Sequence, residues 1–346
     1  AETTEPERNP LPYQQPEEPI RLADLANFLK KPIDTFFQRR LQVHFEELEN
    51  DDTDNENFDL NGLDRWRLDS ELIRDGVIKA VSEEELHERL EATLDRMARR
   101  GDLGMGITEH RLRTELAGRL PDLHQRYRAA LADWPEAISE PLQFEYQYQN
   151  GTGSVEVVDL IDNLRSNPDG HLCRLVVAGS SLLSGSGGSK KVRYANLMRD
   201  WVIHLAGQLT DQPFETLILA REEKRTFPLP RMEPEQARQH LEAILAYWME
   251  ATTRTLPIHC EAGFAWITSY YQSKKYRGDD ERARSEAEQA YTTALERDTG
   301  YLRAAFDSPE ALLASGEFEA LLHQLYLPLW EAEQGTSAAE QIEGEA

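Results

Sequence analysis

Three carboxylates lie on one predicted strand near the middle of the sequence. Residues 155–164 read VEVVDLIDNL, so Glu156, Asp159 and Asp162 sit among β-branched and apolar residues. Carboxylate oxygens are the ligands that Mg²⁺ prefers in proteins. Because side chains alternate between the two faces of a strand, these three cannot all converge on one ion. Asp162 is the best single candidate for a metal ligand, and the alternative is a strand-end Asp that faces water or caps a loop.

The strand that would complete a metal site lacks the residues for it. An NPDG turn at 167–170 leads into the apolar run LCRLVVA at 172–178. This frame resembles the hairpin of restriction-endonuclease-like (PD-(D/E)XK) nucleases, whose second strand supplies an Asp or Glu with a Lys two residues later. No Asp or Glu occurs between Asp169 and Asp200. We therefore predict a nuclease scaffold with no catalytic residue and no metal, in which Asp162 is a vestige.

A Gly- and Ser-rich loop ends in a short basic segment. Residues 184–189 read SGSGGS and are followed by Lys190, Lys191 and Arg193. A Walker A loop needs Gly-Lys-Ser/Thr, and this order is absent. A helix is predicted next, so its first amides could hold an anion. We weigh a flexible surface loop against a contact of these three cations with DNA phosphate.

A second basic segment carries aromatic residues. Residues 271–277 read YQSKKYR, which places three cations between and after two tyrosines. Charge combined with stacking is how many proteins hold single-stranded nucleic acid. The alternative is an ordinary solvated helix face. If DNA is contacted, the residues concerned are Tyr271, Lys274, Lys275, Tyr276 and Arg277.

Composition indicates a globular protein with an unusual charge. The chain has 346 residues, 40% of them hydrophobic, and a net charge of −25. Such a charge opposes non-specific binding of nucleic acid, although much of the acid is segregated into a dense run at residues 46–59 and the two termini. The run is predicted to be a solvated loop, and a partner-facing segment is the alternative. Origin in a high-salt environment would explain the negative net charge equally well. Because the sequence opens on Ala1, we expect a fragment or a processed product of something longer.

Cysteine usage and hydropathy indicate a cytoplasmic protein. No apolar run approaches the roughly 20 residues of a membrane span, and no signal-peptide pattern opens the chain. Cys173 and Cys260 lie in apolar surroundings and are predicted to be reduced thiols.

Periodicity predicts helices at both ends and strands in the middle. The expected fold class is α/β, a mixed central sheet surrounded by many helices. Residues 1–19 are predicted to be a disordered or extended lead-in, 20–334 a single domain and 335–346 a disordered tail. Strands are expected at 142–148, 155–164, 172–178 and 214–220, and helices at 22–29, 33–43, 82–101, 109–131, 192–209 and from 234 onwards.

Three stretches together resemble a known family. Residues 21–43, from RLADLANFLKKP to FFQRRLQV, resemble the opening of the C-terminal domain of RecC, the gamma subunit of exodeoxyribonuclease V. LNGLDRW at 60–66 is similar to the next motif. GFAW at 263–266 and LYLPL at 325–329 agree in type and order. The resemblance covers roughly residues 20–332 and rests on the order and spacing of motifs that are individually weak.

The resemblance implies a role in a RecBCD-type helicase–nuclease that processes double-strand breaks for recombination. It implies an inactive nuclease-like domain that helps to assemble subunits and guide DNA strands, with RecB-like and RecD-like partners. ATP and Mg²⁺ would be used by those partners, and no cofactor is expected in this chain. Asp162 falls where active relatives keep their first metal-binding Asp. An active Mg²⁺-dependent nuclease and a pure protein-docking module remain the alternatives.

Overall fold

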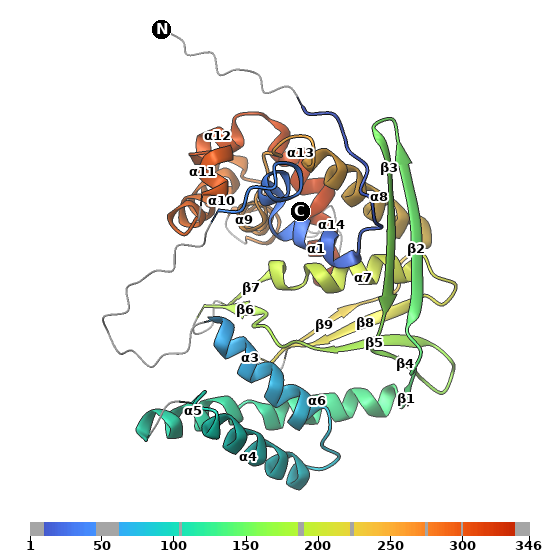
Figure 1. The fold of residues 1–346 in the computed structure, drawn as a ribbon, viewed down its shortest axis with the longest axis vertical. Coiled ribbons are helices and arrows are strands. Elements are labelled where there is room, and N and C mark those ends of the chain that lie inside the picture. Colours follow the sequence, from blue (N-terminus) through green and yellow to red (C-terminus); the bar gives the residue numbers. More distant parts are fainter. Residues whose placement is uncertain are drawn as a thin grey trace.

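A five-stranded mixed sheet lies between two groups of helices in the computed structural model (Figure 1). The structure describes residues 10–45, 62–103, 106–185, 190–221, 225–273, 276–298 and 300–335. The strand order is β1 (Glu136–Ala137), β4 (Leu164–Ser166), β5 (Leu172–Val177), β8 (Phe214–Leu219) and β9 (Thr226–Leu229). β5 and β8 are parallel and the other neighbours are antiparallel. The predicted mixed sheet in a helical shell is confirmed.

The parallel pair depends on a helical crossover. A parallel connection needs a dozen or more residues to return the chain to the same end of the sheet. Here α7 (Met198–Gln208) provides it, preceded by the small β6–β7 hairpin (Leu183–Ser184 with Lys191–Val192) and the 3₁₀ turn η3 (Tyr194–Asn196). The prediction of one helix over 192–209 was therefore wrong at its start, because Lys191 and Val192 pair as a strand.

Each face of the sheet covers its own apolar core. On one face, Phe214 and Ile218 pack with α1 (Leu22–Lys30), α7 and α8 (Pro234–Ala251). On the other, Leu175 and Leu219 belong to a second cluster with the helices below the sheet in Figure 1. Those elements are α3 (Gly62–Leu72), the π-helical segment η2 (Ile73–Val77), α4 (Glu83–Arg99), α5 (Ile107–Ala117) and α6 (Leu120–Asp133). One helix predicted over 109–131 is thus two, α5 and α6, separated at Gly118 and Arg119.

A long hairpin stands beside the sheet. β2 (Leu142–Asn150) and β3 (Gly153–Ile161) pair antiparallel around the predicted Asn-Gly turn and form a sheet of their own. The single strand expected over 155–164 is wrong, because β3 ends at Ile161. Asn163 then adopts a φ of 61°, which interrupts the extended chain, and β4 begins at Leu164. The NPDG turn connects β4 to β5, and these two short strands form the antiparallel hairpin.

The remaining helices lie above the sheet in Figure 1, on the same side as α8. They are α2 (Pro32–Thr35), the π-helical segments η1 (Phe36–Arg40) and η4 (Thr268–Gln272), α9 (Cys260–Ile267), α10 (Asp280–Glu296), α11 (Tyr301–Ala305), α12 (Pro309–Leu313), α13 (Glu317–Leu325) and α14 (Leu327–Gln334). The break predicted at Pro32 is present, since Lys31 separates α1 from α2.

Several predictions concern the termini and the thiols. Residues 10–20 run without helix or strand and are tied at Leu11, whose N–H donates to Thr253 O, and at Ile20, which bridges to Val157. The acidic run 46–59, residues 1–9 and residues 336–346 lie outside the described residues. Both cysteines are free and buried, as predicted. Among the described residues, no helix combines the length and apolar character needed to cross a membrane.

Candidate functional site

Asp162 lies in the bend between the hairpin and the central sheet. It follows the last residue of β3, and its side chain is exposed. Its Oδ1 accepts a hydrogen bond of 2.9 Å from Nδ2 of Asn163. The carboxylate therefore faces solvent beside a neutral amide.

The strand that faces this bend provides no second acid. Leu164 is opposite Arg174, and the N–H of Leu175 donates to the carbonyl of Asn163 at 3.0 Å. β5 reads LCRLVV, so Asp162 meets no carboxylate from it. Within the described ranges, no three His, Cys, Asp or Glu side chains gather in a way that could hold a metal ion.

The other two carboxylates of the predicted acidic strand have different surroundings. Oδ2 of Asp159 accepts from the N–H of Leu22 at 3.0 Å, in the first turn of α1. A carboxylate is stabilised there by the unpaired amides and the helix dipole. Glu156 is exposed, on the opposite face of β3. As expected, the three carboxylates do not converge, and Asp159 fixes α1 to the hairpin.

A buried ion pair occupies the middle of β5. Nη1 of Arg174 lies 2.7 Å from Oδ1 of Asp200 on α7, and the two side chains are only 5% and 14% exposed. Sequence reasoning missed this pair. The signal was an Arg inside an otherwise apolar strand, because a buried charge requires a partner.

A buried histidine extends this polar group along α7. Nδ1 of His204 lies 3.1 Å from the hydroxyl of Thr216 on β8. Gln208, one turn further, donates to the carbonyls of Phe214 at 2.7 Å and of His204 at 3.1 Å. Burial lowers the pKa of His204 to about 4, with a smaller lowering from the Arg174 charge. The imidazole is therefore neutral at pH 7.

Side chains from α3 and α6 fill the carboxyl ends of β5 and β8. In open α/β sheets, ligands usually bind in this position. Here the ion pair of Arg221 and Asp69 is largely buried, and a Cβ at Gly179 would lie 2.6 Å from the hydroxyl of Ser70. Arg126 donates to the carbonyl of Ala220 at 2.8 Å. This end of the sheet is closed by protein.

The first predicted DNA-contact segment lies on the small β6–β7 hairpin. Lys191 is paired with Ser184, and the N–H of Arg193 donates to the carbonyl of Leu182. The side chains of Lys191 and Arg193 are exposed, and Lys190 is half-buried. These placements leave two cations available to a phosphate, and the contact itself stays a prediction.

The second segment is divided between core and surface. Tyr271 is 8% exposed, its hydroxyl lies 3.1 Å from Nε2 of His323, and its ring packs against Trp266 and Trp330. It is a core residue here, so stacking on a base would require it to leave the core.

The neighbours of Tyr271 in this segment are less enclosed. Tyr276 and Arg277 are half-buried, and the guanidinium of Arg282 lies 5.2 Å from the centre of the Tyr276 ring. Lys274 and Lys275 lie outside the described residues. A contact of this segment with DNA stays a prediction.

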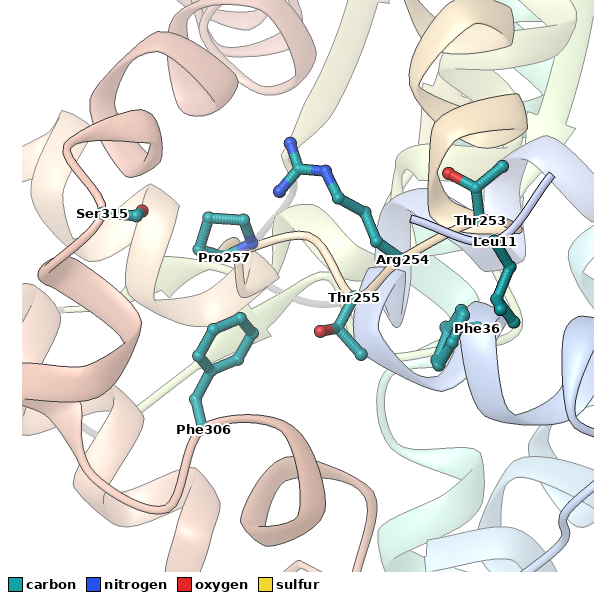
Figure 2. Close-up of a pocket in the computed structure, with 8 residues that line it drawn as sticks. All are labelled: Leu11, Phe36, Thr253, Arg254, Thr255, Pro257, Phe306 and Ser315. Atoms are coloured by element: carbon teal, nitrogen blue, oxygen red, sulfur yellow. The ribbon is translucent and has the colours of Figure 1, made fainter. Parts of the chain in front are cut away.

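A cavity of about 210 Å³ lies elsewhere, beside the end of α8 (Figure 2). Phe36 of η1 and Phe306, in the turn that follows α11, line it, with Thr255 between them. Arg254 also lines it, but its guanidinium is already paired with Glu250 at 2.5 Å and Glu317 at 2.6 Å. The cavity brings no acid–base pair or metal ligands together.

Comparison with known proteins identifies similar sequences. The model of the RecC C-terminal domain family matches residues 17–271. The RecBCD enzyme subunit RecC of Escherichia coli (strain K12) is 28% identical over 288 residues, which are 82% of this chain and 22% of that protein. The RecBCD enzyme subunit RecC of Haemophilus influenzae is 38% identical over 56 residues, 16% of this chain and 5% of that protein. The chain thus spans about a fifth or less of these relatives.

Proposed function

The chain belongs to the RecC C-terminal domain family, and we propose that it is a non-catalytic domain of a RecBCD-type helicase–nuclease. In this proposal it acts in double-strand break repair by recombination, where it helps to assemble the subunits and to guide the DNA strands. Its partners are RecB-like and RecD-like subunits and DNA. ATP and Mg²⁺ are used by the partner subunits.

We further propose that the central sheet is a degenerate PD-(D/E)XK core. The order of its elements supports this: an antiparallel β4–β5 hairpin, the α7 crossover, and β8 parallel to β5. The long β2–β3 hairpin is then an insertion ahead of β4.

The observation that carries the non-catalytic role is the side-chain content of the hairpin. Cleavage through a bound divalent cation requires carboxylates that converge from two strands. Asp162 is exposed on its own bend, and the charged residue of β5 is Arg174, already paired with Asp200. β5 therefore supplies no carboxylate that could join Asp162 around an ion. An active Mg²⁺-dependent nuclease is therefore the weaker interpretation.

Guidance of DNA would rest on local basic segments within an acidic body. The net charge of −25 opposes a broad phosphate contact. We expect weak binding of the chain to a DNA fork, lost steeply between about 50 and 200 mM salt, because the contacts are to phosphate. Lys190, Lys191, Lys274, Lys275 and Arg277 are the residues whose replacement by Ala should abolish it.

The experiment is a cleavage assay with linear single- and double-stranded DNA and either Mg²⁺ or Mn²⁺. We expect no cleavage by the purified chain. Asp162→Ala is the test variant, and Asp169→Ala, at another exposed position in the NPDG turn, is its control. Cleavage that disappears in Asp162→Ala and persists in Asp169→Ala would overturn the non-catalytic role and establish a nuclease.

A further inference from the structure

The β2–β3 hairpin has one edge that already accepts another segment. The N–H of Ile20 donates to the carbonyl of Glu156 at 2.8 Å, and the N–H of Val158 donates to the carbonyl of Ile20 at 3.0 Å. The backbone groups of Glu156 and Val158 therefore point away from β2. In an antiparallel pair, the residue opposite such a position also directs its N–H and C=O away from its partner strand. The partners on β2 therefore direct these groups towards the free edge of β2.

This rule identifies the outward-facing backbone groups of β2. Glu156 is opposite Gln147, and Val158 is opposite Glu145. The alternation continues along the strand, so Gln143 and Gln149 are oriented in the same way. Within the part of the chain that the structure describes, β2 pairs with β3 alone. One edge of nine residues is thus open, with four N–H and four C=O groups directed outward.

The open edge lacks the features that normally prevent strand addition. Natural edge strands are protected by Pro, by a bulge, by Lys, or by being short. β2 is nine residues long and reads LQFEYQYQN, and its register with β3 is continuous from Leu142 to Asn150. Neither strand contains Pro, Lys or Arg. An edge of this kind indicates a surface that is covered when the protein is assembled.

We propose that the free edge of β2 accepts an extended strand of a partner subunit, with basic or polar residues alternating with apolar ones. The outer face of the hairpin carries the carboxylates of Glu145 and Glu156, beside Val158 and Leu160, which are 37% and 59% exposed. Neither strand of the hairpin provides a Lys or Arg to pair with these acids. Lys or Arg on the incoming strand would pair with these acids. Because neither strand carries Lys or Arg, the hairpin does not offer DNA phosphate the cations that its binding depends on.

The inner face of the hairpin explains why every second residue of the partner strand should be apolar. Phe144 is 3% exposed and stacks on Tyr146, with ring centres 6.1 Å apart. Tyr148 is half-buried on the same side. Side chains of an added strand on this face would pack against these aromatic rings, which favours apolar residues at those positions. Backbone bonds would then provide the affinity, and the alternating side chains the choice of partner.

The inference rests on the proposed role in subunit assembly and is tested on the full-length protein, alone and with RecB-like and RecD-like subunits. Hydrogen exchange should slow by at least about tenfold on assembly at the amides of Gln143, Glu145, Gln147 and Gln149. The intervening amides, which bond to β3, should exchange equally in both states. They also report that the hairpin is folded.

A proline provides the matched variant. Gln147→Pro removes one outward N–H and leaves the β2–β3 bonds intact, since Pro is tolerated where an edge N–H faces outward. Binding to the partner subunit should weaken by about tenfold, while Gln147→Thr, which keeps the N–H, should bind like the wild type.

Each outcome separates the two proposals. Unchanged exchange at the four amides in the assembled complex overturns strand addition and leaves the subunit role standing. Failure of the full-length protein to bind either subunit overturns both. Slowed exchange at these amides on adding DNA alone would show that nucleic acid is the occupant, and would overturn the inference as well.

Discussion

The Arg174–Asp200 pair predicts a large and specific loss of stability. Arg174→Ala removes the guanidinium that lies 2.7 Å from Asp200 and leaves that carboxylate, 14% exposed, without its partner. Removing one member of a buried pair costs about 3–5 kcal/mol, because an uncompensated charge remains in a low-dielectric region. The free energy of unfolding, measured by urea denaturation at pH 7, should fall by that amount.

Two further variants test the reasoning. Arg174→Met combined with Asp200→Leu removes both charges and should recover most of the loss, since apolar residues of similar volume can replace a buried pair. Arg74→Ala removes an exposed guanidinium from Asp75, which keeps its pairs with Lys79 and Arg96, and should leave the free energy of unfolding close to that of the wild type. A cost for Arg174→Ala as small as that of Arg74→Ala would refute the claim that β5 depends on an internal counter-charge.

Two other predictions concern α7. The pKa of His204 is about 4 in the folded protein and ordinarily 6.5, so the stability that the neutral imidazole contributes is complete above pH 6.5 and is lost as the pH falls towards 4. Between pH 7 and 5, the free energy of unfolding of the wild type, measured with urea, should therefore fall by about 2 kcal/mol more than that of His204→Gln. Equal losses in the two proteins would contradict this. Gly207→Ala would place a Cβ in the ring of Phe214, so we expect a destabilisation of about 1–3 kcal/mol, seen as a lower Tm, whereas an unchanged Tm would mean that the ring moves freely.

The sequence predicted the strands better than their connections. Alternation over 142–148 and the Asn-Gly turn were sufficient to predict the β2–β3 hairpin. The division of 155–164 into β3 and β4 was not predictable, because VEVVDLIDNL continues to favour a strand throughout. The interruption depends on the positive φ of Asn163, a conformation that Asn tolerates but does not require. Pairing with two different sheets, rather than local propensity, decides the boundary.

The polar side chains were harder to place than the elements. Arg174 and Asp200 are 26 residues apart, and only the packing of α7 on β5 brings them together. The Tyr and Lys pattern of 271–277 was interpreted as a surface, although Tyr271 belongs to the core. The helical spacing from Trp266 to Tyr270 and Tyr271, whose rings all pack together, was the available signal. The cations that follow Tyr271 in the sequence led to the interpretation of the whole segment as surface.

The charged groups next to the sheet are balanced by other groups of the protein. A site with two or three converging carboxylates is held together against their mutual repulsion by the cation that it binds. Here the charge of Asp200 is balanced by Arg174, His204 is held neutral by burial, and Asp159 is bonded to the amide of Leu22. A sheet compensated internally keeps its geometry whether or not Mg²⁺ is present. We therefore expect the same free energy of unfolding with and without a chelator, and a lower value with the chelator would contradict this.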